Sequence, residues 1–159
     1  MTIHVGDRIP EVTLKRIREG VETVDTRTLF DGKKVLLFAV PGAFTPTCSE
    51  RHLPSYVERY EDFRSRGIEV LCMSVNDPFV MKAWGESQNV PQGLQMLADG
   101  NGDFSRALGL EMDASGYGMG TRSKRFALYA EDGVVKQLHV EAPGEYRVSS
   151  AEYVLEQLG

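Results

Sequence analysis

The chain has 159 residues, of which 42% are hydrophobic and 26% are charged. We expect one globular domain, residues 1–159, because this length can bury a core and the hydrophobic fraction is too high for a disordered chain. Lysine and arginine total 18 against 23 acidic residues, which gives a net charge of −5. An acidic surface repels phosphate backbones and anionic lipids, so we expect neither nucleic acid nor a membrane as a partner. No basic region followed by an apolar stretch opens the chain, which indicates a cytoplasmic protein.

The first half of the chain predicts a hairpin followed by strands that alternate with helices. Residues 11–26 alternate loosely around Glu19-Gly20, as in a peripheral hairpin, and residues 35–40 are apolar on both faces, as in a central buried strand. Residues 53–63 carry apolar side chains at helical spacing, with Pro54 expected to kink the helix or to push its regular part downstream. A second buried strand is expected at 68–75, and Asn76-Asp77-Pro78 predicts the start of another helix.

The second half predicts a strand at 94–98, a short helix at 104–108 and a hairpin. The hairpin would pair residues 126–130 with 134–140 around Glu131-Asp132-Gly133. Ser149 and Glu152 have the spacing of a capping box for a last helix. Strands joined through helices imply an α/β fold with a mixed, mainly parallel central sheet that helices flank on both faces.

Cys48 stands just after a buried strand, at the predicted start of a helix, with Thr45 as a candidate N-cap. Unpaired backbone N–H groups and the positive end of the helix dipole favour the thiolate there, which is the nucleophilic form of cysteine. We therefore expect a sulfur that is ionised and accessible. A free cysteine is often a small apolar core residue, and position alone leaves both interpretations open.

The residues around Cys48 resemble the active-site motif of the peroxiredoxins. Residues 40–49 read VPGAFTPTCS, which is similar to the type II, peroxiredoxin-five-like branch; residues 74–80 with Trp84, and residues 120–126, resemble further signatures of that branch. The resemblance covers nearly the whole chain. It implies a thioredoxin-like fold with an N-terminal β-hairpin extension, and a thiol peroxidase that protects the cell from hydrogen peroxide and alkyl hydroperoxides.

The resemblance also implies a role for each motif residue. Cys48 would be the peroxidatic nucleophile, which attacks a peroxide oxygen and becomes a sulfenic acid. Thr45 would hydrogen-bond the thiolate and the peroxide, Pro41 would shield the pocket from water, and Arg125 would stabilise the thiolate and the charge that moves between the oxygens. Arg122 is the rival arginine, and we prefer Arg125 because it directly precedes Phe126.

Less specific signals suggest where the substrate would bind. Backbone N–H groups at the helix start, around Thr47, could contact the peroxide. Phe44, Leu110 and Phe126 could form an apolar wall, or could simply belong to the core.

The resemblance further bears on how the sulfenic acid would be reduced. Many type II relatives carry a resolving cysteine before the last helix, whereas residues 147–151 here read RVSSA. Cys72 is the remaining candidate, but it lies in the middle of a predicted strand, where a core thiol is the simpler interpretation. We therefore expect a one-cysteine cycle with glutathione and glutaredoxin, or thioredoxin, as the reductant.

Three other patterns carry no function of their own. Residues 99–110 begin like a calcium loop, but Phe104 and Leu110 stand where glycine and glutamate are required. The glycines at 116–120 follow no buried strand, so we interpret them as a loop near the active site rather than a nucleotide-binding loop. His52 could form a dyad with Cys48, but we expect a helix-surface histidine. No spacing suggests a metal site, and we expect no cofactor.

Two function classes remain open at this point. One is a thiol peroxidase, and the other is a thioredoxin-fold redox sensor that uses Cys48 but turns over poorly. The presence of Pro41, Thr45, Cys48 and Arg125 together favours the enzyme. Type II members commonly pair through the face near the active-site loop, so the resemblance also implies a homodimer.

Overall fold

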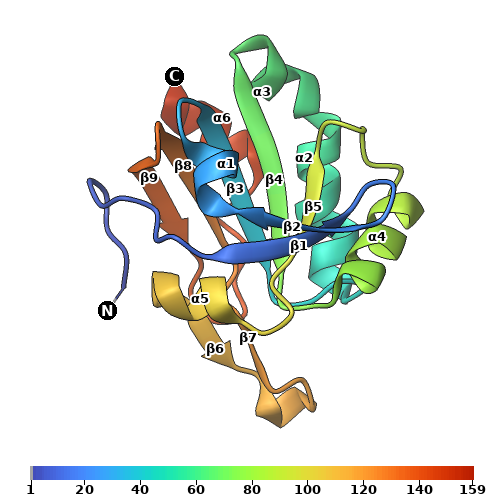
Figure 1. The fold of residues 1–159 in the computed structure, drawn as a ribbon. Helices are drawn as coiled ribbons and strands as arrows, with labels where there is room; N and C mark the ends of the chain where they lie inside the picture. The colour runs from blue at the N-terminus through green and yellow to red at the C-terminus, as the bar shows by residue number, and fades with distance from the viewer. Residues whose placement is uncertain (1) are drawn as a thin grey trace.

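The computed structural model describes residues 2–159 and is built on a seven-stranded mixed sheet (Figure 1). The strand order is β2-β1-β5-β4-β3-β8-β9, in which β3, β4 and β5 run parallel and the other pairs are antiparallel. The strands of this sheet are β1 (Thr13–Ile17), β2 (Val21–Asp25), β3 (Lys34–Val40), β4 (Ile68–Ser74), β5 (Gln95–Ala98), β8 (Phe126–Glu131) and β9 (Val134–Val140). This arrangement confirms the predicted α/β class, the N-terminal hairpin and the central strands.

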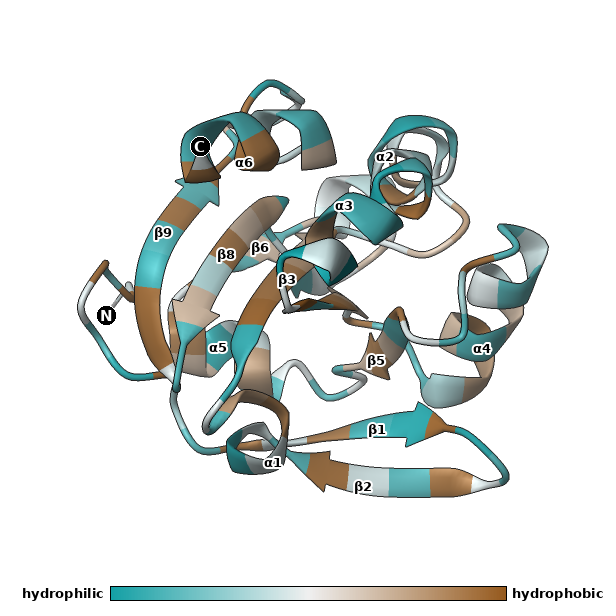
Figure 2. Ribbon diagram, turned by 90° about the horizontal axis from the view of Figure 1, so that it is seen from above, coloured by the Kyte–Doolittle hydropathy of each residue, from teal (hydrophilic) through white to brown (hydrophobic). Residues whose placement is uncertain are grey.

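Helices cover both faces of the sheet, as Figure 2 shows from above. On one face lie η1 (Cys48–His52), α2 (Leu53–Glu58), α3 (Tyr60–Ser65), α4 (Pro78–Ser87) and α6 (Ala151–Leu158). On the other face lie α1 (Thr26–Phe30) and α5 (Asp103–Leu108). Among the residues that the structure describes, no helix is long and apolar enough to span a membrane.

The central strand β3 separates two hydrophobic cores. Leu36, Phe38 and Val40 face the core beneath α2, α3, α4 and α6, whereas Val35, Leu37 and Ala39 face the core beneath α1 and α5. Neighbouring side chains of a strand point to opposite faces, so a strand buried on both sides is apolar throughout. The Phe38 ring stacks on Tyr56 of α2 with centroids 4.0 Å apart, which fixes the helix after Cys48 against the sheet.

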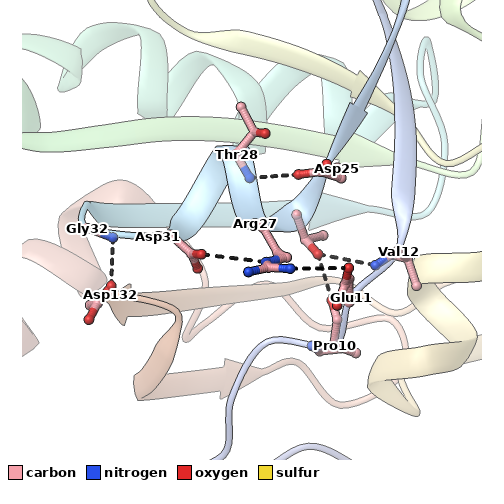
Figure 3. Close-up of polar contacts among 10 residues, drawn as sticks. Pro10, Glu11, Val12, Asp25, Arg27, Thr28, Asp31, Gly32 and Asp132 are labelled. Carbon is pink, nitrogen blue, oxygen red and sulfur yellow. Dashed lines mark hydrogen bonds and ion pairs between the residues drawn. The ribbon is translucent and has the colours of Figure 1, made fainter.

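The short helix α1 joins the N-terminal hairpin to β3 (Figure 3), and the sequence analysis did not predict it. It is only five residues long, too short for a clear helical period, and local capping defines it: the Asp25 carboxylate accepts a 2.7 Å hydrogen bond from the Thr28 N–H. Arg27 lies between Glu11 and Asp31, 3.8 Å from each carboxylate. These contacts hold α1 against the segment that precedes β1.

The second half of the chain differs from the prediction in two places. Strands β6 (Glu111–Asp113) and β7 (Thr121–Ser123) form a separate two-stranded sheet around the turn η2 (Ser115–Tyr117), and strands of three residues are too short to show alternation. The N-cap of α6 is Ser150, whose Oγ accepts from the Tyr153 N–H at 3.1 Å. The predicted cap, Ser149, is wrong because its Oγ instead donates to the Glu141 carboxylate at 2.7 Å.

Candidate active site

The predicted site lies at the carboxyl end of β3, where the chain leaves the sheet and turns into η1 and α2 (Figure 1). Phe44 has a φ of 65°, the left-handed region that few non-glycine residues adopt, and helical backbone begins at Pro46. Cys48 opens a π-helical turn in which the Leu53 N–H donates to the Cys48 carbonyl. Pro54 follows directly, in the first turn of α2, so the regular helix starts downstream of Cys48, in agreement with the second effect predicted for Pro54.

Arg125 reaches the sulfur of Cys48 from the segment that precedes β8. Its Nη2 donates a 3.2 Å hydrogen bond to the Cys48 Sγ. The Cys48 side chain is 0% exposed, because its helix packs into the core that contains Val40, Ala43 and Leu53. The expectation of an accessible sulfur is therefore wrong for this conformation, since loop, helix and arginine together cover the thiol.

The loop before Cys48 is held by its own hydrogen bonds and by the glycine-rich segment. Thr45 Oγ1 donates to the Gly42 carbonyl at 2.6 Å, so its side chain neither caps the helix nor bonds the sulfur. Arg122 Nη1 donates to the Pro41 carbonyl at 3.4 Å and its Nε to the Met119 carbonyl at 2.9 Å. The segment around Met119 thus packs on the loop, and of the two candidate arginines only Arg125 bonds the sulfur.

Contacts with β4 and α4 fix the same loop from the other side. Asn76 Oδ1 accepts from the Ala43 N–H at 3.0 Å and from Ser74 Oγ at 2.6 Å. The Trp84 indole N–H donates to Ser49 Oγ at 3.0 Å, one residue after Cys48. The sequence analysis assigned Trp84 to the core, where it lies, but adjacent positions alone could not reveal that it also holds the turn.

His52 is fully buried, so the predicted position on the helix surface is wrong. Its Nδ1 accepts from Arg125 Nη1 at 2.9 Å and its Nε2 donates to the Ser149 carbonyl at 3.0 Å. Arginine only donates and a carbonyl only accepts, so the ring is neutral with its proton on Nε2. Burial, together with the positive charge of Arg125, lowers the pKa of His52 to about 3.

Glu141 holds the loop that carries the Ser149 carbonyl. Its carboxylate accepts from the backbone N–H groups of Arg147, Val148 and Ser149 at 2.8 to 2.9 Å, in addition to Ser149 Oγ. Burial raises the pKa of Glu141, but these hydrogen bonds outweigh it and the net shift is downward. The Glu141 N–H also donates to the Arg125 carbonyl at 2.9 Å. Glu141 thus positions the loop beneath His52 with its carboxylate and the backbone of Arg125 with its own N–H.

The second cysteine lies in the same core as Cys48. Cys72 is fully buried in β4, where it pairs with Phe38 of β3 and Met96 of β5. Burial raises the pKa of the Cys72 thiol well above its usual value, with a smaller contribution in the same direction from the neighbouring Cys48. Both cysteines are free thiols.

The candidate substrate-wall residues lie in different places. Thr47 is half-buried beside Cys48, and Phe44 is exposed on the loop. Leu110 and Phe126 instead belong to the core on the opposite face of the sheet, because Phe126 pairs with Ala39 and shares its orientation. The structure therefore does not bring these two side chains to the sulfur.

The Asp99 segment has a structural role. Its carboxylate accepts from the N–H groups of Phe104 and Ser105 and from Ser105 Oγ, at 2.9 to 3.0 Å, and so holds the start of α5. Within residues 2–159, no group of three histidine, cysteine or acidic side chains is placed to hold a metal ion.

Comparison with known proteins identifies the family. The redoxin family model matches residues 4–155. Peroxiredoxin-2B of Arabidopsis thaliana is 46% identical, and the match covers 98% of each chain. This chain belongs to the redoxin family, as a type II peroxiredoxin. The finding confirms the predicted resemblance and makes the chain a thiol peroxidase.

Two solved structures of other peroxiredoxins show how far the likeness extends. Reduced Prx3 from Vibrio vulnificus in complex with H2O2 is 49% identical, with a TM-score of 0.95 over 99% of this chain and 100% of its own. Peroxiredoxin 5 from Alvinella pompejana is 38% identical, with a TM-score of 0.80 over 87% of this chain and 90% of its own. The predicted thioredoxin-like peroxiredoxin fold is thus confirmed.

The low pKa of His52 makes the stability of this peroxiredoxin depend on pH. The pKa is about 3 in the folded chain and near 6.5 in the unfolded chain, so between these values only the unfolded chain binds the proton. The contribution of neutral His52 to the free energy of unfolding is complete above pH 6.5. It falls by about 1.4 kcal/mol for each pH unit below pH 6.5. We expect the free energy of unfolding in urea, measured from pH 7 to 5, to fall more steeply for the native chain than for His52→Gln.

His4→Gln, which removes an exposed histidine, is the matched control and should keep the native slope. Equal slopes for the native chain and His52→Gln would contradict the assignment of a buried, neutral ring.

Proposed function

We propose that this peroxiredoxin reduces hydrogen peroxide and alkyl hydroperoxides through a sulfenic acid on Cys48, in antioxidant defence, and that glutathione with glutaredoxin restores the thiol in a one-cysteine cycle. The observation that carries the proposal is the 3.2 Å hydrogen bond from Arg125 to the Cys48 sulfur. A guanidinium at that distance stabilises a thiolate over a thiol, and the thiolate is the form that attacks peroxide. Two free thiols also suit the cytoplasm, where disulfides are rare.

In the peroxide step, a lone pair of the Cys48 sulfur attacks one oxygen and the O–O bond breaks. The leaving oxygen takes the electron pair of that bond and departs, after protonation, as water or an alcohol. Negative charge thus moves from sulfur to the leaving oxygen, and Arg125 can follow it without rearrangement. Thr45 donates its own proton to the Gly42 carbonyl, which leaves its Oγ1 lone pairs to accept a hydrogen bond from the peroxide O–H.

A buried sulfur requires a small opening before the substrate enters. Hydrogen peroxide is only slightly larger than water, and Thr45 and Thr47 beside Cys48 are half-buried rather than sealed. We propose that the peroxide enters past these side chains, with Pro41 limiting the water that follows it.

Arg125→Gln tests the peroxide step. Because it removes the charged donor from sulfur, we expect the second-order rate constant for peroxide to fall by about 10²- to 10³-fold. Arg122→Gln is the matched control, since this arginine bonds loop carbonyls and not the sulfur, and we expect a loss below about tenfold. Stopped-flow peroxide consumption measures both. A larger loss in Arg122→Gln than in Arg125→Gln would reverse the assignment.

Two features of this chain support a one-cysteine cycle. Residues 147–151, in the neighbourhood where many type II relatives carry a resolving cysteine, hold no thiol, and the Glu141 carboxylate fixes residues 147–149. Cys72 is in a central strand with a raised pKa, so its thiol stays protonated and would need local unfolding to reach the surface. A small external thiol is therefore a better reductant for the sulfenic acid on Cys48 than Cys72 is.

Cys72→Ser is expected to keep its turnover with glutathione and glutaredoxin. Mass spectrometry after one equivalent of peroxide should show a sulfenic acid on Cys48, and a glutathione adduct once glutathione is added. Loss of turnover in Cys72→Ser, or a Cys48–Cys72 disulfide in the native chain, would contradict the one-cysteine cycle. Oxidation that stops after one equivalent would favour the redox sensor instead.

We also propose a homodimer that pairs through the end of the sheet near the active site. Three large side chains are exposed there: Phe44 at 55%, Phe79 at 66% and Tyr117 at 86%. Phe44 follows β3 and Phe79 lies in the first turn of α4, and the hydrogen bond between Ala43 and Asn76 joins the two segments. Exposed aromatic side chains on neighbouring loops are typical of a protein interface.

Phe79→Glu tests this interface by placing a charge in it. We expect the native chain to sediment as a dimer and Phe79→Glu to sediment as a monomer at the same concentration. Val21→Glu is the control, because Val21 is 51% exposed on β2 at the edge of the sheet. A native chain that stays monomeric at high concentration would contradict the proposal.

A further inference from the structure

The arginines around Cys48 carry no carboxylate partner. Within residues 2–159, five arginines lie within 4.0 Å of an acidic side chain, and these are Arg16, Arg27, Arg59, Arg106 and Arg147. Arg51, Arg122 and Arg125 are not among them, although the chain has a net charge of −5. These three guanidinium groups are therefore not neutralised by an ion pair with an acidic side chain.

Arg51 is the member of this group that is exposed and yet held in place. Its guanidinium carbon lies 4.5 Å from the centroid of the Tyr146 ring, within the range of a cation–π contact. The Tyr146 hydroxyl donates to the Arg51 carbonyl at 3.2 Å, and the ring packs edge-on against His52 with centroids 5.3 Å apart. The tyrosine is thus anchored at both ends, and the guanidinium N–H groups of Arg51 remain available.

The position of Arg51 relates it directly to the sulfur. It follows Cys48 by three residues in the same π-helical turn. The guanidinium carbon of Arg125, which bonds the sulfur, lies 6.0 Å from the same Tyr146 centroid. A ligand that reaches Cys48 with one group can therefore reach Arg51 with another if it spans about three residues, or about 10 Å.

We propose that Arg51, held on Tyr146, binds a carboxylate of glutathione while the glutathione thiol attacks oxidised Cys48. The inference rests on the proposed function and names a binding site for its reductant. Glutathione is a tripeptide with two carboxylates and one ammonium group, and an arginine fork matches a carboxylate with two parallel hydrogen bonds. Because Tyr146 already orders the guanidinium, binding costs less conformational entropy than it would for a free side chain.

The chemical step balances without a further reactant. The glutathione sulfur attacks the sulfur of Cys48 sulfenic acid, an S–S bond forms and the S–O bond breaks. The oxygen leaves as water with the proton of the thiol, so the glutathione sulfur is oxidised and the Cys48 sulfur is reduced. The product is Cys48 linked to glutathione, which a second thiol then releases.

The test compares a charged thiol with an uncharged one on the full chain. Cys48 is oxidised with one equivalent of H2O2 and mixed with glutathione or with 2-mercaptoethanol, and the loss of the sulfenic acid is followed by stopped flow and mass spectrometry. The quantity compared is the rate constant for glutathione divided by that for 2-mercaptoethanol. Since a hydrogen bond to a charged group contributes about 1.5 kcal/mol or more, Arg51→Gln should lower this ratio about tenfold. Added salt should lower the ratio in the native chain and much less in the variant.

Two controls separate a binding role from general effects. Arg59→Gln makes the same change in net charge at an exposed arginine that pairs with Asp62, and should leave the ratio unchanged. Glu152 is an exposed acidic residue whose charge acts on Tyr146, and Glu152→Gln should not lower the ratio.

Equal slowing of both thiols by Arg51→Gln, or an unchanged ratio, would overturn the glutathione site while leaving the peroxidase cycle intact. A native chain that forms no sulfenic acid, or whose sulfenic acid reacts with neither thiol, would overturn the proposed function as well. That failure shows before any variant is compared.

Discussion

The hydrogen bond between Arg125 and the Cys48 sulfur is the contact around which the site is built. One guanidinium serves two acceptors, the sulfur and the Nδ1 of His52. The second acceptor is a neutral ring rather than a carboxylate, so the positive charge of the arginine is not offset there. A carboxylate at that place would orient Arg125 equally well, but it would reduce the stabilisation of a thiolate. The same positive charge contributes to the low pKa of His52, because it disfavours a second proton on the ring.

The arrangement depends on a second buried group, the Glu141 carboxylate. It orders residues 147–149 by backbone hydrogen bonds, and this segment supplies the carbonyl that accepts from both His52 and Tyr56. A carboxylate that satisfies this many donors resists local opening, since each unpaired N–H would be left buried. The hydrogen bonds of Glu141 therefore support Arg125 through His52, and they also hold residues 147–149 in place.

Burial of the sulfur and its reactivity place opposite demands on the structure. A dry environment strengthens the interaction between guanidinium and sulfur, but it disfavours an isolated thiolate and hinders the substrate. Cys48 has a charged partner, the Arg125 guanidinium, at hydrogen-bond distance from its sulfur. Cys72 lies in the same core without such a partner, and burial raises the pKa of its thiol. Two cysteines of one hydrophobic core thus differ in their electrostatic surroundings, because only Cys48 has a cation beside its sulfur.

Features that depend on neighbouring residues were determined by the sequence alone. The buried strands β3 and β4, the hairpin turn at Asp132-Gly133, the late start of the regular helix at Pro54 and the family motif around Cys48 could all be predicted, because their periods and turn residues are local. Helix α1 and strands β6 and β7 could not be predicted, because elements of three to five residues show no period.

Only the tertiary structure decided what surrounds the sulfur. The family motif already favoured Arg125 over Arg122, but it could not show that Arg125 bonds both the sulfur and a neutral His52. The bonds from Arg125 to Cys48 and His52, and from His52 to Ser149, join residues that are 73 to 97 positions apart in sequence. The tertiary structure also showed that Phe126 faces the opposite core, which follows from its pairing with Ala39. Sequence spacing cannot reveal such contacts, because the sheet and the packing of α2 and α6 bring these residues together.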